Sequence, residues 1–369
     1  MKLVKRIFKW MGIVTLVVVL MGGLYLFVAY WQSSNDCDRN TSAPTHPMKA
    51  IRKCEYGTLM LRTVEKPIPT DDQVLVKVRA ASLNAADGHL LRGSFVMRPL
   101  TGMRKPKDSR FGIDCAGTVE AVGKNVTQFK PGDEVFGAAN GAVADYVCAP
   151  ERTLVTKPDN ITFQQAGSVA VAGLTALQGL RNQGNIQPGQ KVLVNGASGG
   201  VGTFAVQIAK AFGAEVTAVC SPRNLEQARS IGADHVIDYT KEDFTMGDQR
   251  YDMIFDNVGN HTIADRRRVL NPNGICVLAG MGSAGKHEGQ LPRLAGHLKS
   301  FFVSPFISQK FKFFIAKLLK ADLIVLRDLM QEGKVKPVID REYPMSETAE
   351  ALRYLEEGHA RGKVVITIE

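Results

Sequence analysis

The sequence predicts an α/β protein that combines a mostly β domain with a doubly wound parallel sheet, preceded by one transmembrane helix. Three observations lead to this fold class: period-two alternation between residues 73 and 123, a strand–helix rhythm after residue 173, and an uncharged apolar segment over residues 10–31. Alternating apolar and polar residues are typical of half-buried strands, whereas strands that alternate with helices form parallel sheets. The 369 residues leave room for two domains and an appendage.

The composition excludes several classes of protein. Hydrophobic residues make up 45% of the chain and charged residues 22%, which is unlike a disordered, collagen-like or polytopic membrane protein. The net charge of +10 gathers at the N-terminus and between residues 293 and 336. No base-reading or stacking module accompanies it, so we expect no nucleic-acid partner. Six cysteines lie far apart without a C-x-x-C pair, and we expect isolated thiols. They are Cys37, Cys54, Cys115, Cys148, Cys220 and Cys276.

The apolar segment predicts a membrane anchor over residues 1–31, followed by a polar linker over residues 32–47. About 20 apolar residues suffice to cross a bilayer, and Trp10 and Trp31 mark the two interfaces. A cleaved signal peptide is the competing interpretation, but its apolar region is normally only about 7–15 residues long and ends at a small-residue site. We therefore expect a single-pass membrane protein with the lipid bilayer as a partner. The side of the membrane that carries the rest of the chain is left open.

The remaining elements follow from periodicity and turn residues. Gln73–Arg79 and Gly117–Gly123 alternate at period two, which predicts a small, mostly antiparallel β domain. The later strands are expected at 191–197, 215–221, 235–239, 251–259 and 274–280, with helices at 201–213 and 225–233. The chain then predicts a helix at 323–332, a helix at 346–358 capped by Ser346, and a strand at 363–368.

A glycine-rich loop predicts the cofactor site. An apolar strand runs into it and a helix follows, an arrangement that lets backbone N–H groups hold a pyrophosphate. Gly196 would allow a tight turn, Gly199 the close approach of phosphate, and Gly202 the contact between helix and strand. The spacing G-x-x-G-x-x-G departs from the usual G-x-G-x-x-G, and a loop used only for packing is the alternative. The predicted contributors are Gly196, Ala197, Ser198, Gly199, Gly200, Val201 and Gly202.

The end of the second strand favours NADPH over NADH. An NAD site usually carries an acid there for the ribose 2′-hydroxyl, whereas a 2′-phosphate needs donors and a cation. No acid occurs before Glu226, while Ser221, Arg223 and Asn224 are all present. The alternative is that Arg223 is only a solvated residue of the first helical turn.

The motifs taken together resemble a known family. They are 80–87 (AASLNAAD), 111–123 (FGIDCAGTVEAVG), 130–136 (KPGDEVF), 173–176 (GLTA), 195–202 (NGASGGVG), 232–239 (GADHVIDY) and 362–366 (GKVVI). From about residue 48 to residue 369, the chain resembles the medium-chain dehydrogenase/reductase superfamily. Within it, the closest resemblance is to the zinc-free quinone oxidoreductase branch that includes zeta-crystallin.

The resemblance implies how the domains are arranged. A GroES-like catalytic domain would be built from residues 48–172 and 312–369. A Rossmann NADP-binding domain over residues 173–311 would lie between these two parts and complete an enoyl reductase domain, with the active site in the cleft.

The resemblance also implies roles for individual residues. It places Asn84 beside the nicotinamide as the first catalytic candidate and Thr175 near the nicotinamide or phosphate. Asp87 either takes part in catalysis or only caps a helix. Tyr239 would line the 2′-phosphate. The other implied cofactor-binding residues are Asn257, Gly280 and Lys363.

Departures from the zinc enzymes of the superfamily predict that no metal is bound. Asn84 and Ile113 occupy the positions of a cysteine and a histidine ligand, and the structural-zinc cysteine cluster is absent. A zinc site needs three or four ligands. His89 remains nearby, but one histidine is more often a packing residue.

The predicted function is NADPH-dependent reduction of a quinone or an α,β-unsaturated carbonyl, without zinc. The alternative is a membrane-tethered NADPH-binding interaction protein with little or no turnover. The segment 299–320, with six phenylalanines and five lysines, either lies on the bilayer or forms family elements. In the second case, residues 294–307 form a helix beside the cleft and residues 309–316 form the last Rossmann strand. Two copies of the chain would pair at this strand in a homodimer.

Overall fold

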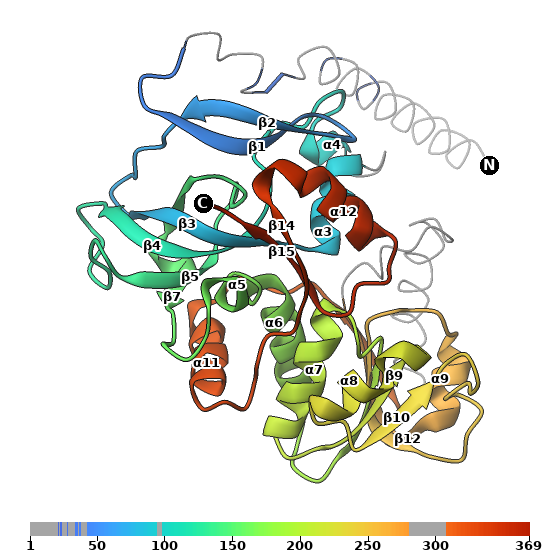
Figure 1. The fold of residues 1–369 in the computed structure, drawn as a ribbon. Coiled ribbons are helices and arrows are strands. Elements are labelled where there is room, and N and C mark those ends of the chain that lie inside the picture. The colour runs from blue at the N-terminus through green and yellow to red at the C-terminus, as the bar shows by residue number, and fades with distance from the viewer. Residues whose placement is uncertain are drawn as a thin grey trace, which may run out of the picture. The chain divides into compact units, whose positions relative to one another are not determined.

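The protein is shown in Figure 1 as a computed structural model that describes residues 43–93, 98–279 and 308–369, together with single positions before residue 43. The chain forms two compact units. One draws on residues 1–43, 52–60 and 89–110, and the other on residues 44–51, 61–88 and 111–369. The predicted domain boundaries at 172 and 311 stay predictions.

The larger unit contains a parallel sheet that the described residues build from six strands. They are β8 (Lys191–Asn195), β9 (Glu215–Cys220), β10 (His235–Asp238), β11 (Tyr251–Asp256), β12 (Leu270–Ala279) and β13 (Lys310–Phe314). The spatial order is β10-β9-β8-β11-β12-β13, and every pair is parallel. This is the doubly wound order, with the first strand and the fourth as central neighbours. The predicted Rossmann sheet is confirmed.

Helices connect parallel strands where α7 (Gly200–Ala211) follows β8, α8 (Leu225–Ser230) follows β9 and α9 (Ile263–Val269) follows β11. Two earlier helices, α5 (Phe163–Ala166) and α6 (Ala170–Leu177), precede β8 in the chain. A π-helical turn, Gln178–Gln183, continues α6, and the 3₁₀ turn Pro222–Asn224 precedes α8. In α7, Phe204 and Ile208 are completely buried at helical spacing. Figure 1 shows α7 and α8 lying along the sheet beside β9.

A second sheet of the larger unit confirms the predicted β-rich part. Its strands are β3 (Gln73–Leu83), β4 (Asp114–Val122), β5 (Glu134–Ala138), β6 (Tyr146–Pro150), β7 (Leu154–Thr156), β14 (Ile339–Pro344) and β15 (Lys363–Thr367). The order is β14-β15-β3-β4-β5-β7, and β6 also pairs with β3. Only the pairing of β14 with β15 is parallel among these strands. Figure 1 shows β15 beside β3, where Val364 pairs with Leu83.

The last helices correct one capping prediction. They are α11 (Lys320–Gln331), which packs on α6 and β7, and α12 (Thr348–Glu356). Ser346 does not cap α12, because it lies inside a 3₁₀ turn, Met345–Glu347, that precedes the helix. Instead, the Thr348 hydroxyl donates to the Met345 carbonyl. A similar 3₁₀ turn, Glu151–Thr153, precedes β7.

The segment 299–320 agrees in part with its family interpretation. β13 pairs with β12 where the last Rossmann strand is expected, at 309–316. The helix expected at 294–307 lies outside the described residues.

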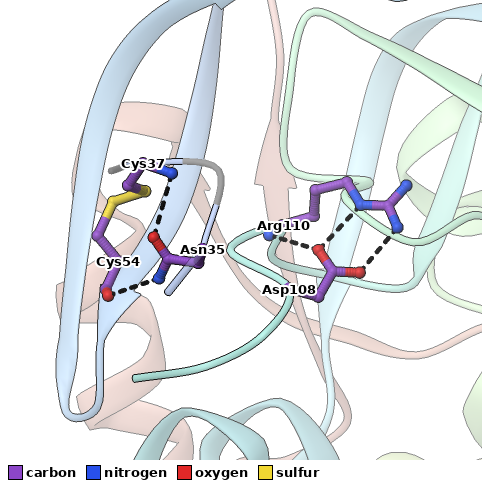
Figure 2. Close-up of a disulfide and its surroundings, with 5 residues drawn as sticks. All are labelled: Asn35, Cys37, Cys54, Asp108 and Arg110. Carbon is purple, nitrogen blue, oxygen red and sulfur yellow. Dashed lines mark hydrogen bonds and ion pairs between the residues drawn. A yellow bond between two sulfur atoms is a disulfide. The ribbon is translucent and has the colours of Figure 1, made fainter. Parts of the chain in front are cut away.

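The smaller unit contains an unexpected disulfide. It includes parts of the hairpin β1 (Pro47–Glu55) and β2 (Thr58–Glu65) and of α3 (Ala85–Arg92), as well as α4 (Arg98–Thr101). Figure 2 shows Cys37 bonded to Cys54, with the Asn35 side chain donating to the Cys54 carbonyl and accepting the Cys37 N–H. The Asp108–Arg110 ion pair of the same unit also appears there. The prediction of isolated thiols was wrong for Cys37 and Cys54, because cysteines 17 positions apart are brought together by the fold.

The predicted membrane localisation is contradicted. No helix among the described residues is long and apolar enough to cross a bilayer. The longest of them, α7 and α11, have 12 residues each and reach about 18 Å, whereas a hydrocarbon core is about 30 Å thick. The anchor predicted at 1–31 falls mostly outside the described residues, and so does about half of the linker predicted at 32–47.

The Cys37–Cys54 bond can be tested by counting thiols. We expect the unreduced, denatured chain to expose four free thiols of its six cysteines. Reduction should lower the free energy of unfolding by about 3 kcal/mol, because the bond closes a short loop in the unfolded chain. Cys54→Ser should abolish that response, while Cys148→Ser should retain it. Six free thiols before reduction would exclude the bond.

Candidate active site

The glycine-rich loop lies between the end of β8 and the start of α7. Gly196 has a φ of +82°, a conformation that glycine adopts readily. A Cβ on Gly202 would lie 2.0 Å from the Gly196 carbonyl oxygen, so α7 approaches the loop too closely for any side chain there. The predicted turn at Gly196 and the predicted contact at Gly202 are both present.

Gly199 has space around it that fits a phosphate group. It is the N-cap residue of α7, and a Cβ added to it would meet only the Gly196 oxygen, at 3.7 Å. This opening lies where the first N–H groups of a 12-residue helix have no intrahelical acceptor. The loop therefore fits a pyrophosphate held against backbone. Its role as a cofactor site stays a prediction.

A pocket of about 440 Å³ lies beside this loop, at the carboxyl ends of β8, β9, β10 and β11. It brings eight predicted cofactor residues together: Gly196, Ser198, Gly199, Ser221, Arg223, Asn224, Tyr239 and Asn257. The predicted Ala197, Gly200, Val201 and Gly202 belong to the loop and α7 but do not line the pocket. Gly280 lies outside the described residues. Lys363 points into a different polar cluster.

Two side chains at the end of β9 can donate to an anion. The Asn224 side-chain amide donates to Ser221 Oγ at 3.0 Å, which leaves the serine hydrogen for another acceptor. Arg223 donates one N–H to the His359 carbonyl at 2.6 Å, while a guanidinium has five. The pocket also contains the His359 segment, which sequence reasoning missed because it lies 136 positions away.

Several further pocket residues carry no sequence signal of their own. Glu242, Asp243 and His261 line the pocket, and Asp243 accepts hydrogen bonds from Thr245. Burial would raise the pKa of the Asp243 carboxyl, but the hydrogen bonds from Thr245 outweigh burial and hold it below its usual value. Burial raises the pKa of the Cys220 thiol to about 11, so this pocket residue is neutral at pH 7.

A buried carboxylate orders one edge of the pocket. Asp256 ends β11, and its Oδ1 accepts from the Asn195 amide and from the N–H groups of Val258 and Gly259, at 2.9–3.0 Å. Its Oδ2 pairs with Arg266 at 2.6 Å. Burial would raise the pKa of Asp256, but the Arg266 charge and these N–H groups outweigh it and hold the pKa low. Sequence reasoning missed the Asp256–Arg266 ion pair. The available signal was that two adjacent strands, β8 and β11, end in the polar residues Asn195 and Asp256.

Asp87 orients the backbone at Asn84. The Asn84 N–H donates to Asp87 Oδ2 at 2.7 Å, and the Asp87 N–H donates to the Asn84 carbonyl at 2.9 Å. These reciprocal bonds lie at the start of α3. They favour the orienting alternative for Asp87 over a direct part in catalysis.

The Asn84 side chain belongs to a buried cluster that reaches from β3 to β15. Its amide nitrogen donates to Asp114 Oδ2 at 3.0 Å, and its oxygen accepts from Lys363 Nζ at 2.6 Å. Asp114 also accepts from Ser82 Oγ at 2.8 Å, from Lys363 Nζ at 3.2 Å and from the Val171 N–H at 2.9 Å. Asp114 and Lys363 are 0% and 2% exposed. Sequence reasoning missed Asp114 and Ser82 because nothing local marks their partners.

Thr175 lies one helical turn beyond this cluster. Its hydroxyl donates to the Val171 carbonyl at 2.7 Å, and the Val171 N–H donates to Asp114. The Thr175 side chain is therefore fixed on α6, with its oxygen still able to accept a hydrogen bond. Asn84 and Thr175 are thus connected through Asp114.

No metal-ligand set is evident in the part of the chain that the structure describes. There, no three His, Cys, Asp or Glu side chains gather as ligands for one ion. The expected absence of a metal stays a prediction.

Comparisons with known proteins identify two family models. Residues 70–159 match the alcohol dehydrogenase GroES-like domain, and residues 231–366 match the zinc-binding dehydrogenase domain.

Individual relatives cover most of the chain. The NAD(P)H oxidoreductase RTN4IP1, mitochondrial, of Homo sapiens is 34% identical and aligns with 92% of this chain and 96% of its own. The NADPH-dependent alkenal/one oxidoreductase, chloroplastic, of Arabidopsis thaliana is also 34% identical. The alignment covers 86% of this chain and 79% of the relative. The structure of the quinone oxidoreductase from Coxiella burnetii aligns with a TM-score of 0.74 at 30% identity. The alignment covers 88% of this chain and 100% of that one.

The strand order and the place of the pocket at the carboxyl edge are those of dinucleotide-dependent oxidoreductases. Relatives that are 34% identical over nearly the whole chain identify the family within this class of enzymes. The chain belongs to the medium-chain dehydrogenase/reductase family. Quinone oxidoreductases are among its homologues. It is an oxidoreductase with a GroES-like fold and a Rossmann-type fold, and its cofactor is NAD(P)H.

The buried Asp256–Arg266 pair predicts a pH-dependent stability. Because the pKa of Asp256 is held low in the folded state, its contribution is complete above the unfolded value, about 3.9, and is lost as the pH falls through the folded value. Asp256→Asn should cost about 3 kcal/mol at pH 7 and flatten the fall in stability that begins as the pH drops towards about 3.9. The measurement is urea unfolding against pH. Exposed Asp159→Asn is the control, and an equal response of both variants would contradict the prediction.

Two glycine substitutions separate cofactor binding from folding. Gly199→Ala should leave the melting temperature unchanged, since its methyl group would make only an ordinary van der Waals contact, but should weaken NADPH binding at least about tenfold by occupying the phosphate position. Gly202→Ala should instead destabilise the fold, because its methyl group collides with backbone. Fluorescence titration and thermal unfolding check both. Unchanged NADPH affinity in Gly199→Ala would move the pyrophosphate away from this loop.

Proposed function

We propose that the chain is an NADPH-dependent reductase that acts on a quinone or an α,β-unsaturated carbonyl without zinc. The observation that carries this proposal is the buried cluster of Asn84, Asp114 and Lys363, which provides amide and ammonium groups at a position where zinc enzymes of the family have a ligand. The printed names of relatives, an alkenal/one oxidoreductase and a quinone oxidoreductase, support it. NADPH, when bound, supplies the hydride.

Asn84 stabilises the oxygen of the substrate. Hydride addition to a quinone or to the β-carbon of an enone leaves negative charge on oxygen, and a fixed donor near that oxygen stabilises the charge. The Asn84 amide has two N–H groups, and one donates to Asp114. The other is available for the substrate. Thr175 lies beside the nicotinamide in this proposal, and Asp87 keeps the Asn84 backbone in place.

Preference for NADPH comes from the end of β9. Ser221 and Arg223 donate to the 2′-phosphate, Asn224 orients Ser221, and the ring of Tyr239 covers the same end of the pocket. Asn257 and Gly280 contribute to the remaining cofactor surface. Glu242 and Asp243 line the pocket too, so the charge of Arg223 is needed to offset theirs.

The same buried cluster supports independence from zinc. The oxygen of Asn84 already accepts a hydrogen bond from the Lys363 ammonium at 2.6 Å. This bond uses an acceptor site of the oxygen that a metal ion would need.

The proposal includes a homodimer. Among the strands that the structure describes, β13 lies at one edge of the parallel sheet, and Ile315, directly after it, is 69% exposed. An exposed strand edge with apolar side chains favours pairing with a second copy. Sedimentation of the full-length chain tests this.

Turnover of the full-length protein tests the proposed function. NADPH and NADH oxidation are followed with a quinone, then with an enone, before and after treatment with a chelator. We expect NADPH-dependent turnover that the chelator does not change. Tight NADPH binding without turnover on a broad panel would instead favour a nucleotide-binding interaction protein.

Arg223→Ala tests the basis of cofactor choice. Loss of a charge-assisted hydrogen bond costs about 1.5–3 kcal/mol, so the KM for NADPH should rise about 10- to 100-fold while that for NADH changes little. Arg229→Ala, an exposed arginine on α8 that does not line the pocket, is the control. An equal rise for both cofactors in Arg223→Ala would exclude the 2′-phosphate contact.

A further inference from the structure

We propose that Lys363 is a positioning residue that holds Asn84 as a hydrogen-bond donor to the substrate and connects this orientation to the cofactor loop. The inference rests on the proposed function of Asn84. It assigns Lys363 a role different from direct contact with the cofactor.

The first argument is the directionality of the hydrogen bonds. An ammonium group can only donate, and an ionised carboxylate can only accept. Lys363 Nζ lies 2.6 Å from Asn84 Oδ1, and Asp114 Oδ2 lies 3.0 Å from Asn84 Nδ2. A flipped amide would set N–H groups against the ammonium and oxygen against the carboxylate. The pair therefore allows one orientation, in which the remaining polar group of Asn84 is an N–H.

The second argument is that stability alone does not account for the buried charges. The Lys363 and Asp114 side chains are 3% and 0% exposed, with 3.2 Å between Nζ and Oδ2. Removing two charges from water is costly, and apolar residues often replace such a pair without loss of stability. A charged pair does, however, distinguish the oxygen of the Asn84 amide from its nitrogen, which are nearly identical in shape.

The third argument is the contact between Lys363 and the cofactor loop. A Cβ on Gly200, the first residue of α7, would lie 2.9 Å from Lys363 Cδ. The backbone before the lysine is also constrained, since Gly362 has a φ of +136° and a Cβ there would lie 2.4 Å from the Val338 oxygen. The lysine stem thus passes across the start of α7 on its way to Asn84. Gly200 is small because the stem needs this space.

This arrangement determines which substrates the site accepts. An N–H directed at the substrate favours an oxygen that accepts a hydrogen bond, as in a quinone or an enone. Lys363 and Asp114 together therefore favour substrates whose reacting oxygen accepts a hydrogen bond.

The first test is kinetic and uses the full-length chain. Lys363→Met should lower kcat for a quinone by about 100-fold, the lower end of the loss when an oxyanion donor is removed. The dissociation constant for NADPH should change less than about threefold, since the lysine acts through Asn84. In an Asn84→Ala background, Lys363→Met should have no further effect on kcat. Full additivity of the two losses would overturn the proposal, because a merely structural lysine would act independently of Asn84.

The second test does not depend on turnover. The side-chain amide signals of Asn84, identified by their loss in Asn84→Ala, are followed by NMR in ¹⁵N-asparagine-labelled protein without cofactor. We expect protected, distinct signals that lose their protection in Lys363→Met but not in the exposed control Lys334→Met. Unchanged Asn84 signals in Lys363→Met would refute the positioning role. If turnover is absent but the signals respond, only the proposed function fails.

A further variant is the control for the case that Lys363→Met does not fold. Lys363→Met leaves the Asp114 carboxylate buried without its ion-pair partner, which can unfold the sheet. Asp114→Asn combined with Lys363→Met removes both charges, so a folded protein is expected. The same loss of Asn84 protection should appear in it, and retained protection would contradict the proposal.

Discussion

A carboxylate buried inside a protein must be surrounded by donors, and Asp114 meets this requirement with groups from three other segments of the chain. Ser82 and Asn84 reach it from the end of β3, Lys363 from β15, and the Val171 N–H from α6. Because each donor has to be in place, the registers of β3, β4 and β15 and the start of α6 depend on one another. The position of Asn84, and of Thr175 one turn along α6, follows from this single charged group.

Asp256 satisfies the same requirement in the cofactor half of the protein. Its two oxygens are bonded to Arg266, Asn195 and two backbone N–H groups, and the segment that lines the pocket follows directly. Asp256 thus orders a loop at the carboxyl end of the parallel sheet, and Asp114 joins β strands to a helix. In both cases the polar side chains that a ligand would meet are held by groups that the ligand does not touch.

The parts of this protein that are predictable from sequence are those determined by local pattern. Strand–helix alternation and the glycine spacing identify the parallel sheet and its loop, and Ser221, Arg223 and Asn224 follow because they lie within one turn of a strand end. Asp114 and His359 could not be found in this way, since their partners lie on distant segments.

The two wrong predictions, on the thiols and on the membrane location, concern properties that a local sequence pattern does not determine. The Cys37–Cys54 disulfide depends on where the chain before β1 returns, which no spacing rule contains. The apolar segment at 10–31 has the composition of a membrane helix, but composition alone does not establish a membrane location for the protein.

The position of β15 has a consequence for how the protein folds. Asn84 and Lys363 are 279 positions apart, and contacts of such long separation are slow to form because a long loop must close first. The intervening parallel sheet closes much of that loop by itself, since several of its neighbouring strands, such as β8 and β9, are close in sequence. Assembly of the reaction centre is therefore expected to be a late event that follows formation of the parallel sheet. A chain trapped before β15 joins β3 would have the parallel sheet and its glycine-rich loop, but its pocket would still lack the His359 segment that directly precedes β15.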